Sequence, residues 1–107
     1  MATLIMKSIE CIRANDVTGS DEPYLTVDGQ PVWSGSMKKA ETEVLSGGRA
    51  DEVEFTGSVL VRLLETNNHS SKQIDVPYRV DDDPTNNGKA VFKTSGTHYE
   101  VEYRVVA

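Results

Sequence analysis

Oxygen-bearing side chains gather between the apolar runs of this sequence, and their chemistry is that of an ion site. Asp16 and Asp21 lie in the turn-rich segment 15–23. Glu65 and Asn67 follow an apolar run further along the chain. Ca²⁺ takes roughly six to eight oxygen ligands and accepts carboxylate, amide and carbonyl groups together. These four side chains are therefore the candidate ligands of a calcium ion.

A second acidic stretch consists of Asp81, Asp82 and Asp83. It is a possible second ion site, but three adjacent side chains cannot all point at one ion. The alternative interpretation is a solvated acidic turn that protects a strand edge from pairing with another chain. Zinc is disfavoured because the chain has one Cys and two widely separated His residues, without zinc-ligand spacing.

The hydrophobic pattern that must position these residues is that of β-strands. Apolar residues alternate with polar ones over 97–106 and 74–80, whereas 58–65 is apolar on both faces and predicts a central strand. Pro77 confines its strand to a sheet edge or a bulge. The expected strands are 3–13, 24–27, 30–33, 40–45, 53–55, 58–65, 74–80, 90–93 and 97–106. The stretch 38–45, which includes the expected strand 40–45, could instead form two helical turns.

Local signals add detail to these strands. Asp28-Gly29 between two alternating runs predicts a two-residue hairpin turn. Counting outward from it pairs Leu25 with Val32 and Tyr24 with Trp33. The first strand changes its buried face near Lys7–Ser8, which predicts a bulge there. We further expect a polar loop over 66–72 and a second turn at Asn87-Gly88.

Length and composition predict one domain, 1–107, that is an all-β, antiparallel β-sandwich of seven to nine strands. Seventeen acids against eleven bases give a net charge of −6, which argues against nucleic acid as a partner. The single cysteine, Cys11, is expected to be a buried hydrophobe. With no signal-peptide or membrane-span pattern, we expect a soluble protein, either cytoplasmic or a domain excised from a longer chain.

Four motifs resemble those of C2-type calcium-binding sandwiches, and most closely those of compact bacterial C2-like modules. The motifs are D-x-x-x-S-D-x-P-Y-L-x-V from Asp16 to Val27, V-x-F at Val53–Phe55, V-L-V-R-L-L-E-T-N at 59–67, and Tyr-x-x-x-Tyr at Tyr99–Tyr103. The resemblance implies that Asp16 and Asp21 are first-loop ligands and that Glu65 and Asn67 form the later-loop pair.

This chain departs from the C2 pattern after Asn67. Where the family carries further acids, it has His69, two serines, Lys72 and Gln73. Fewer anionic ligands weaken calcium binding, and the Lys72 ammonium could occupy the ion's place. The resemblance therefore implies a calcium site that is weak, reduced or lost.

The sequence contains no motif of a catalytic nucleophile, a phosphate loop or a paired-His site, so we expect no enzyme. Three hypotheses remain. The first is a Ca²⁺-binding module that contacts a protein partner, another copy of itself or, less favourably for lack of apolar loop tips, a membrane surface. The second is a metal-free structural or assembly protein. The third is a carbohydrate-binding module that uses Tyr24, Trp33 or Tyr78.

Overall fold

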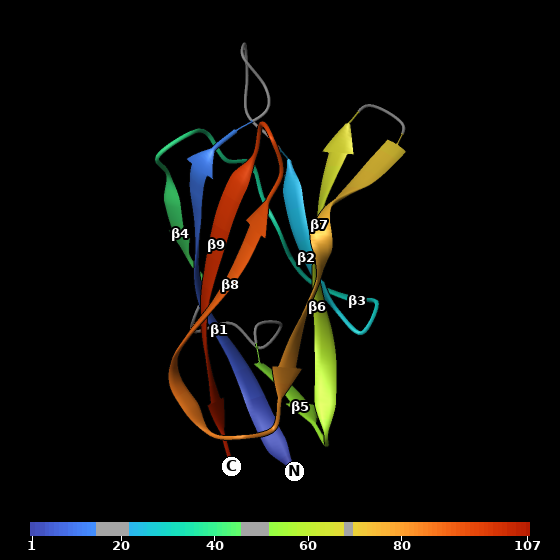
Figure 1. Ribbon diagram of the computed structural model, residues 1–107, viewed down its shortest axis with the longest axis vertical. Coiled ribbons are helices and arrows are strands. Elements are labelled where there is room, and N and C mark those ends of the chain that lie inside the picture. The colour runs from blue at the N-terminus through green and yellow to red at the C-terminus, as the bar shows by residue number, and fades with distance from the viewer. Residues whose placement is uncertain (15–21, 46–51, 68–69) are drawn as a thin grey trace.

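The computed structural model describes residues 1–14, 22–45, 52–67 and 70–107, which fold into two antiparallel sheets packed face to face (Figure 1). The strands are β1 (Ala2–Arg13), β2 (Pro23–Val27), β3 (Gln30–Ser34), β4 (Thr42–Val44), β5 (Glu52–Phe55), β6 (Ser58–Asn67), β7 (Ser70–Asp81), β8 (Thr85–Lys93) and β9 (His98–Val106). The described residues contain no helix, so the predicted all-β sandwich is confirmed and 42–44 is a strand.

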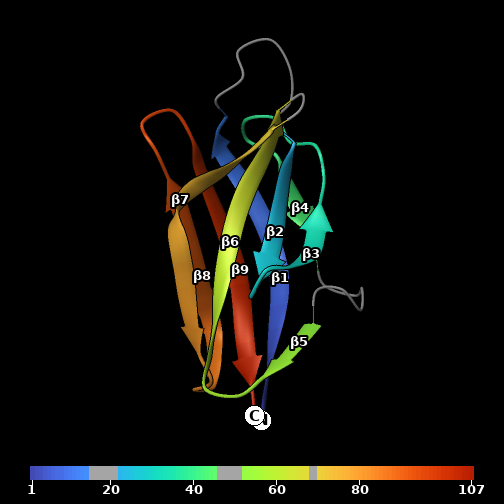
Figure 2. The same cartoon turned by 90° about the vertical axis from the view of Figure 1, so that its right-hand side faces the viewer.

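One sheet has the order β4-β1-β9-β8, with β5 also paired to β1, and the other has the order β3-β2-β6-β7. Both β4 and β5 run antiparallel to β1 along one edge, β4 beside Ile9 and β5 beside Leu4. They therefore act as one interrupted strand. In consequence β6 runs in the same direction as β1, and both strands finish at the end of the sandwich away from the chain termini (Figures 1 and 2).

The core lies between the two sheets and is built from the inward side of each strand. Its fully buried members include Leu4, Met6, Ile9, Cys11, Leu25, Leu63, Phe92, Tyr99 and Val101. Buried positions on β1 change parity between Met6 and Ile9, where the pairing with β9 is shifted at Lys7. The predicted bulge near Lys7–Ser8 and the predicted burial of Cys11 are both confirmed.

The Asp28-Gly29 turn forms as predicted, with positive φ angles of 49° and 84°. The Asp28 carboxylate also accepts a hydrogen bond of 2.8 Å from the Leu60 amide, which fixes the turn against β6. The predicted cross-strand pairs are wrong. A register shift in β3 opposes Leu25 to Trp33 and Tyr24 to Ser34, so that Tyr24 and Trp33 lie on opposite faces of the sheet.

Two further expectations are corrected by the strand pairing. The polar segment 66–72 is not an open loop, because Thr66, Asn67, Ser70, Ser71 and Lys72 continue the β6–β7 ladder.

Asn87-Gly88 is not a turn either. It lies inside β8 at a register shift, and the Tyr103 ring covers Gly88. A Cβ atom at residue 88 would lie 2.3 Å from Tyr103 Cζ. Glycine is therefore required at this position, because any side chain would clash with the Tyr103 ring.

Strand β7 contains a bulge around Asp75, as the position of Pro77 requires in an edge strand. Asp75 has a positive φ of 64°, and its carboxylate accepts hydrogen bonds from the amides of Val76 at 2.7 Å and Lys93 at 2.9 Å. The second bond joins the edge of one sheet to the edge of the other. The bulge also leaves Val76 71 % exposed, contrary to the expected one-face burial.

These hydrogen bonds predict an acid-dependent contribution of Asp75 to stability. The Lys93 amide, followed by the Val76 amide, lowers the pKa of Asp75 below its ordinary value of 3.8. A carboxylate with a depressed pKa stabilises the fold above its unfolded pKa, and this contribution is lost as the pH falls through the folded pKa. We expect Asp75→Asn, which tolerates the positive φ, to cost about 1 kcal/mol at neutral pH and nothing in strong acid.

Urea unfolding at a series of pH values measures this effect. The difference in free energy of unfolding between wild type and Asp75→Asn should shrink below pH 3.8. Asp83→Asn, in an exposed turn, is the matched control. A constant difference at every pH would contradict the role given to the charge.

Candidate metal-binding end of the sandwich

The candidate calcium ligands belong to two chain segments, and the described residues next to them meet at one end of the sandwich. Pro23 opposes Glu65 in the β2–β6 ladder, and the Thr66 amide donates a hydrogen bond of 3.0 Å to the Glu22 carbonyl. Glu22 directly follows the segment that holds Asp16 and Asp21. Glu22, where the described chain resumes after that segment, is therefore adjacent to the end of β6.

Glu65 lies on the inward face of β6 by alternation, in line with the buried side chains of Val59, Val61 and Leu63. Its own side chain is half-buried at the rim, where the core ends. On the other side of Glu65, Lys72 of β7 is directly opposed, and opposed residues share a face. An ion near the Glu65 carboxylate would therefore also lie near the exposed Lys72 ammonium.

Asp16 and Asp21 lie outside the described residues, and so does the side chain of Asn67, whose backbone ends β6. Of the four predicted ligands, Glu65 alone is a side chain that the structure describes. Within the ranges 1–14, 22–45, 52–67 and 70–107, no three His, Cys, Asp or Glu side chains are grouped so that they could hold a metal ion.

The second predicted site, Asp81–Asp83, lies at the opposite end, beside the turn between β5 and β6. The Asp82 amide donates a hydrogen bond of 3.0 Å to the Gly57 carbonyl, and the Gly57 amide donates one of 3.1 Å to the Asp82 carboxylate. Asp81 pairs with Arg79 at 2.9 Å, and the Asp83 carbonyl accepts a bond from Thr85. These contacts fix the turn, and all three aspartates are exposed.

Comparisons with known proteins supply no family. No protein-family model matches the chain, and a search of curated proteins finds no significant match. The likeness to C2 modules therefore stays a prediction. A proposal about function rests on the geometry of the described residues. The described part of the chain has no helix that is long and apolar enough to cross a membrane.

A hollow of about 370 Å³ opens on the outer face of the sheet at this same end. Tyr24 and Ser34 are opposed across β2 and β3, and Glu22 and Thr66 are joined across β2 and β6. The lining is completed by Pro23, Gly35 and Ser36. The sequence prediction missed Glu22, Ser34, Ser36 and Thr66. The alternation of Glu22 with Tyr24, and of Ser34 with Ser36, indicates that each pair lies on one face of its strand. The register shift in β3 prevented the sequence from showing that Tyr24 and Ser34 are opposed.

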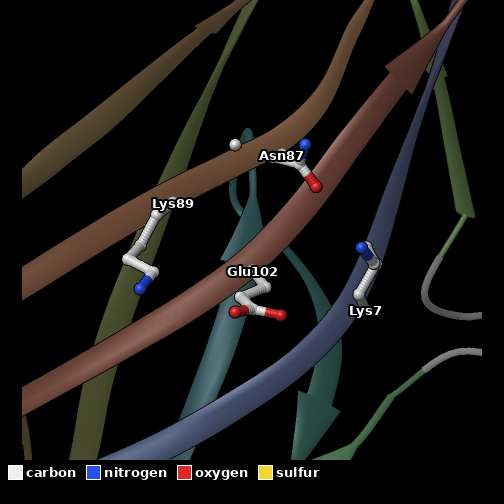
Figure 3. A pocket seen from close by; sticks show the side chains of 5 residues that line it. Lys7, Asn87, Lys89 and Glu102 are labelled. Atoms are coloured by element: carbon white, nitrogen blue, oxygen red, sulfur yellow. The ribbon is translucent and has the colours of Figure 1, made fainter.

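A second hollow, of about 220 Å³, lies on the outer face of the other sheet (Figure 3). Its side chains come from three strands: Lys7 of β1, Asn87 and Lys89 of β8, and Glu102 of β9. The carboxylate of Glu102 lies between the two lysines in this view. Lys89 also pairs with Glu100 at 3.2 Å. Opposite charges alternate across this surface, as is typical of a solvated sheet face.

The three aromatic residues considered for sugar binding have separate roles. Tyr78 and Tyr103 form an edge-to-face pair with ring centroids 5.9 Å apart, and their hydroxyl groups lie 3.2 Å apart. Burial, followed by this hydrogen bond, raises the pKa of Tyr103. Trp33 packs against the core and lies against Gly35. Only Tyr24 lines the outer hollow.

Proposed function

We propose that this protein is a non-enzymatic binding module that takes up Ca²⁺ at the end of the sandwich where β1 and β6 finish. Its ligands are Asp16, Asp21, Glu65 and Asn67. The observation that carries the proposal is the hydrogen bond from the Thr66 amide to the Glu22 carbonyl, at 3.0 Å. This bond holds Glu22, which directly follows the segment of Asp16 and Asp21 in the chain, beside Thr66, which lies between Glu65 and Asn67 in the sequence.

The position of Glu65 supports the same proposal. Its half-buried side chain lies at the rim of the core, at the end of β6 where Pro23 opposes it. A divalent cation bound there neutralises part of the chain's net charge of −6. The bound ion can then bridge to an acidic protein partner or another anionic group, which is the binding role that we propose.

Thermal unfolding of chelator-treated protein with and without millimolar Ca²⁺ tests the proposal, with Mg²⁺ as the control ion. Binding to the native state alone stabilises by RT ln(1 + [L]/Kd), about 2.7 kcal/mol at a hundredfold excess over Kd. We expect a calcium-specific rise in Tm that is lost in Asp21→Asn and reduced in Glu65→Gln. Asp82→Asn, at the opposite end, should retain the rise.

Two results would contradict the calcium proposal. A rise in Tm that is equal with Mg²⁺ would indicate general screening of the acidic surface. No rise at all would favour the metal-free structural or assembly protein, whose exposed strand edges mediate its contacts. Each variant's Tm in chelator is recorded first, so that a loss of fold is not mistaken for a loss of binding.

Removing the charge of Lys72 should strengthen calcium binding. In water, a unit charge and a divalent ion about 6 Å apart repel each other by on the order of 1 kcal/mol. We therefore expect Lys72→Gln to lower the Kd for Ca²⁺ roughly fivefold, as measured by calorimetric titration. Lys7→Gln changes the net charge equally but lies on the other sheet, so it should have a smaller effect. Equal effects of the two variants would place the ion elsewhere.

A further inference from the structure

Among the residues that the structure describes, the lining of the outer hollow next to Glu22 carries no positive charge. The polar side chains of these lining residues are the Glu22 carboxylate, the Tyr24 phenol and the hydroxyl groups of Ser34, Ser36 and Thr66. Hydroxyl groups both donate and accept hydrogen bonds, and a carboxylate accepts them. Such a set matches a neutral ligand that carries several hydroxyl groups, whereas the carboxylate disfavours an anion.

The shape of the hollow is set by backbone pairing. The Gly35 amide donates to the Pro23 carbonyl at 3.1 Å, and the Thr66 amide donates to the Glu22 carbonyl at 3.0 Å. These bonds place the ends of β3 and β6 on either side of β2. Behind the hollow, the Trp33 ring lies so close to Gly35 that an added Cβ would be 2.6 Å from Cζ2. Tyr24, Ser34 and Thr66 are thus held on three paired strands, and Glu22 and Ser36 lie within two residues of the ends of β2 and β3.

We infer that this hollow binds the ring of a neutral sugar. The half-buried Tyr24 ring provides an apolar surface for the C–H face of the sugar, and the Glu22 carboxylate accepts hydrogen bonds from two neighbouring sugar hydroxyl groups. The hydroxyl groups of Ser34 on β3, Thr66 on β6 and Ser36 just after β3 complete the contacts. Volume agrees with this ligand, because about 370 Å³ accommodates a single sugar ring and not a long chain.

The sugar site and the proposed calcium site are separate. Glu65 faces inward between the sheets, whereas Glu22 and Tyr24 belong to the outer face of the same sheet. The sugar site uses none of the four proposed calcium ligands. Its binding is therefore expected in the presence of chelator, so the two proposals can fail independently.

Titration with methyl glycosides of glucose, galactose and mannose tests the inference. Trp33 is the only tryptophan in the chain, and it lies against Gly35 in the lining, so its fluorescence reports occupancy. We expect a saturable change with at least one glycoside and a Kd on the order of 1 mM, as is usual for a ligand of this size. The measurement is made in chelator and repeated in Ca²⁺.

The variants Glu22→Gln and Tyr24→Leu should each weaken glycoside binding about tenfold. Glu54→Gln, an exposed glutamate of β5 in the other sheet, is the matched control and should bind as wild type does. Should Tyr24→Leu fail to fold, the exposed Glu22→Gln decides the matter. No saturable change with any glycoside, or a response to tetramethylammonium in place of the glycosides, would overturn the inference.

Discussion

Leu63→Ala is expected to lower the free energy of unfolding by about 3 kcal/mol, with a cooperative transition retained. Leu63 lies on β6, the strand flanked by β2 and β7, and its side chain is 0 % exposed in the centre of the core. Truncation removes apolar contact area and leaves a cavity that paired strands on both sides cannot close. Urea unfolding, followed by circular dichroism, measures the change.

Leu60→Ala is the matched control, because it makes the same chemical change on the same strand. Leu60 points to the outer face and is 36 % exposed, so its truncation should cost less than about 1 kcal/mol. The ratio of the two losses tests the burial pattern of β6. Equal losses would mean that both faces of this strand are covered, as its sequence alone suggests.

Gly88→Ala is expected to lower the free energy of unfolding by about 2 kcal/mol, through overpacking. The added methyl group would lie 2.3 Å from Tyr103 Cζ, closer than any van der Waals contact. Tyr103 cannot move freely, because its ring is nearly buried and its hydroxyl group is hydrogen-bonded to that of Tyr78. The clash must therefore be relieved by displacing β8 or by breaking this pair.

A double-mutant cycle isolates the clash. In the Tyr103→Leu background the methyl group has room, so the same glycine change should cost less than about 1 kcal/mol. Asn87→Ala, at the exposed neighbouring position, controls for a general effect of substitution in this part of β8. An undiminished cost in the Tyr103→Leu background would show that the Tyr103 ring does not set the requirement for glycine.

The fold was predictable from the sequence because alternation reports burial directly. The alternation of Tyr99, Val101, Tyr103 and Val105 predicted β9, and all four are buried. The exceptions arise at bulges, which depend on pairing between distant strands. The shift in β3 reassigned the partners of Leu25 and Tyr24, and the bulge in β7 turned Val76 to solvent. A single strand signals such a shift only where its apolar residues change parity, as near Lys7–Ser8 in β1, and the alternation of Ile74, Val76, Tyr78 and Val80 shows no such change.

The candidate site was predictable only in part. The direction of β6 brings Glu65 to the end of the sandwich where the described chain resumes at Glu22, since β4 and β5 share one edge and count as a single strand. Asp16 and Asp21 themselves lie outside the described residues. By contrast, the outer hollow could not be foreseen, because Glu22 and Thr66 meet only through the β2–β6 register. The residues that line the outer hollow can be recognised only when the strand register is known. The acidic residues of the candidate calcium site, in contrast, can be recognised from the sequence itself.

A calcium titration followed by amide NMR tests the central claim most directly, because it locates the ion as well as detecting it. We expect saturable, calcium-specific shifts for the amides of 15–22 and 64–67, with Glu22 and Thr66 among them. The amides of Gly57 and Asp82, at the opposite end, should not move. An absence of shifts, or shifts confined to Gly57 and Asp81–Asp83, would rule out a calcium site formed by Asp16, Asp21, Glu65 and Asn67.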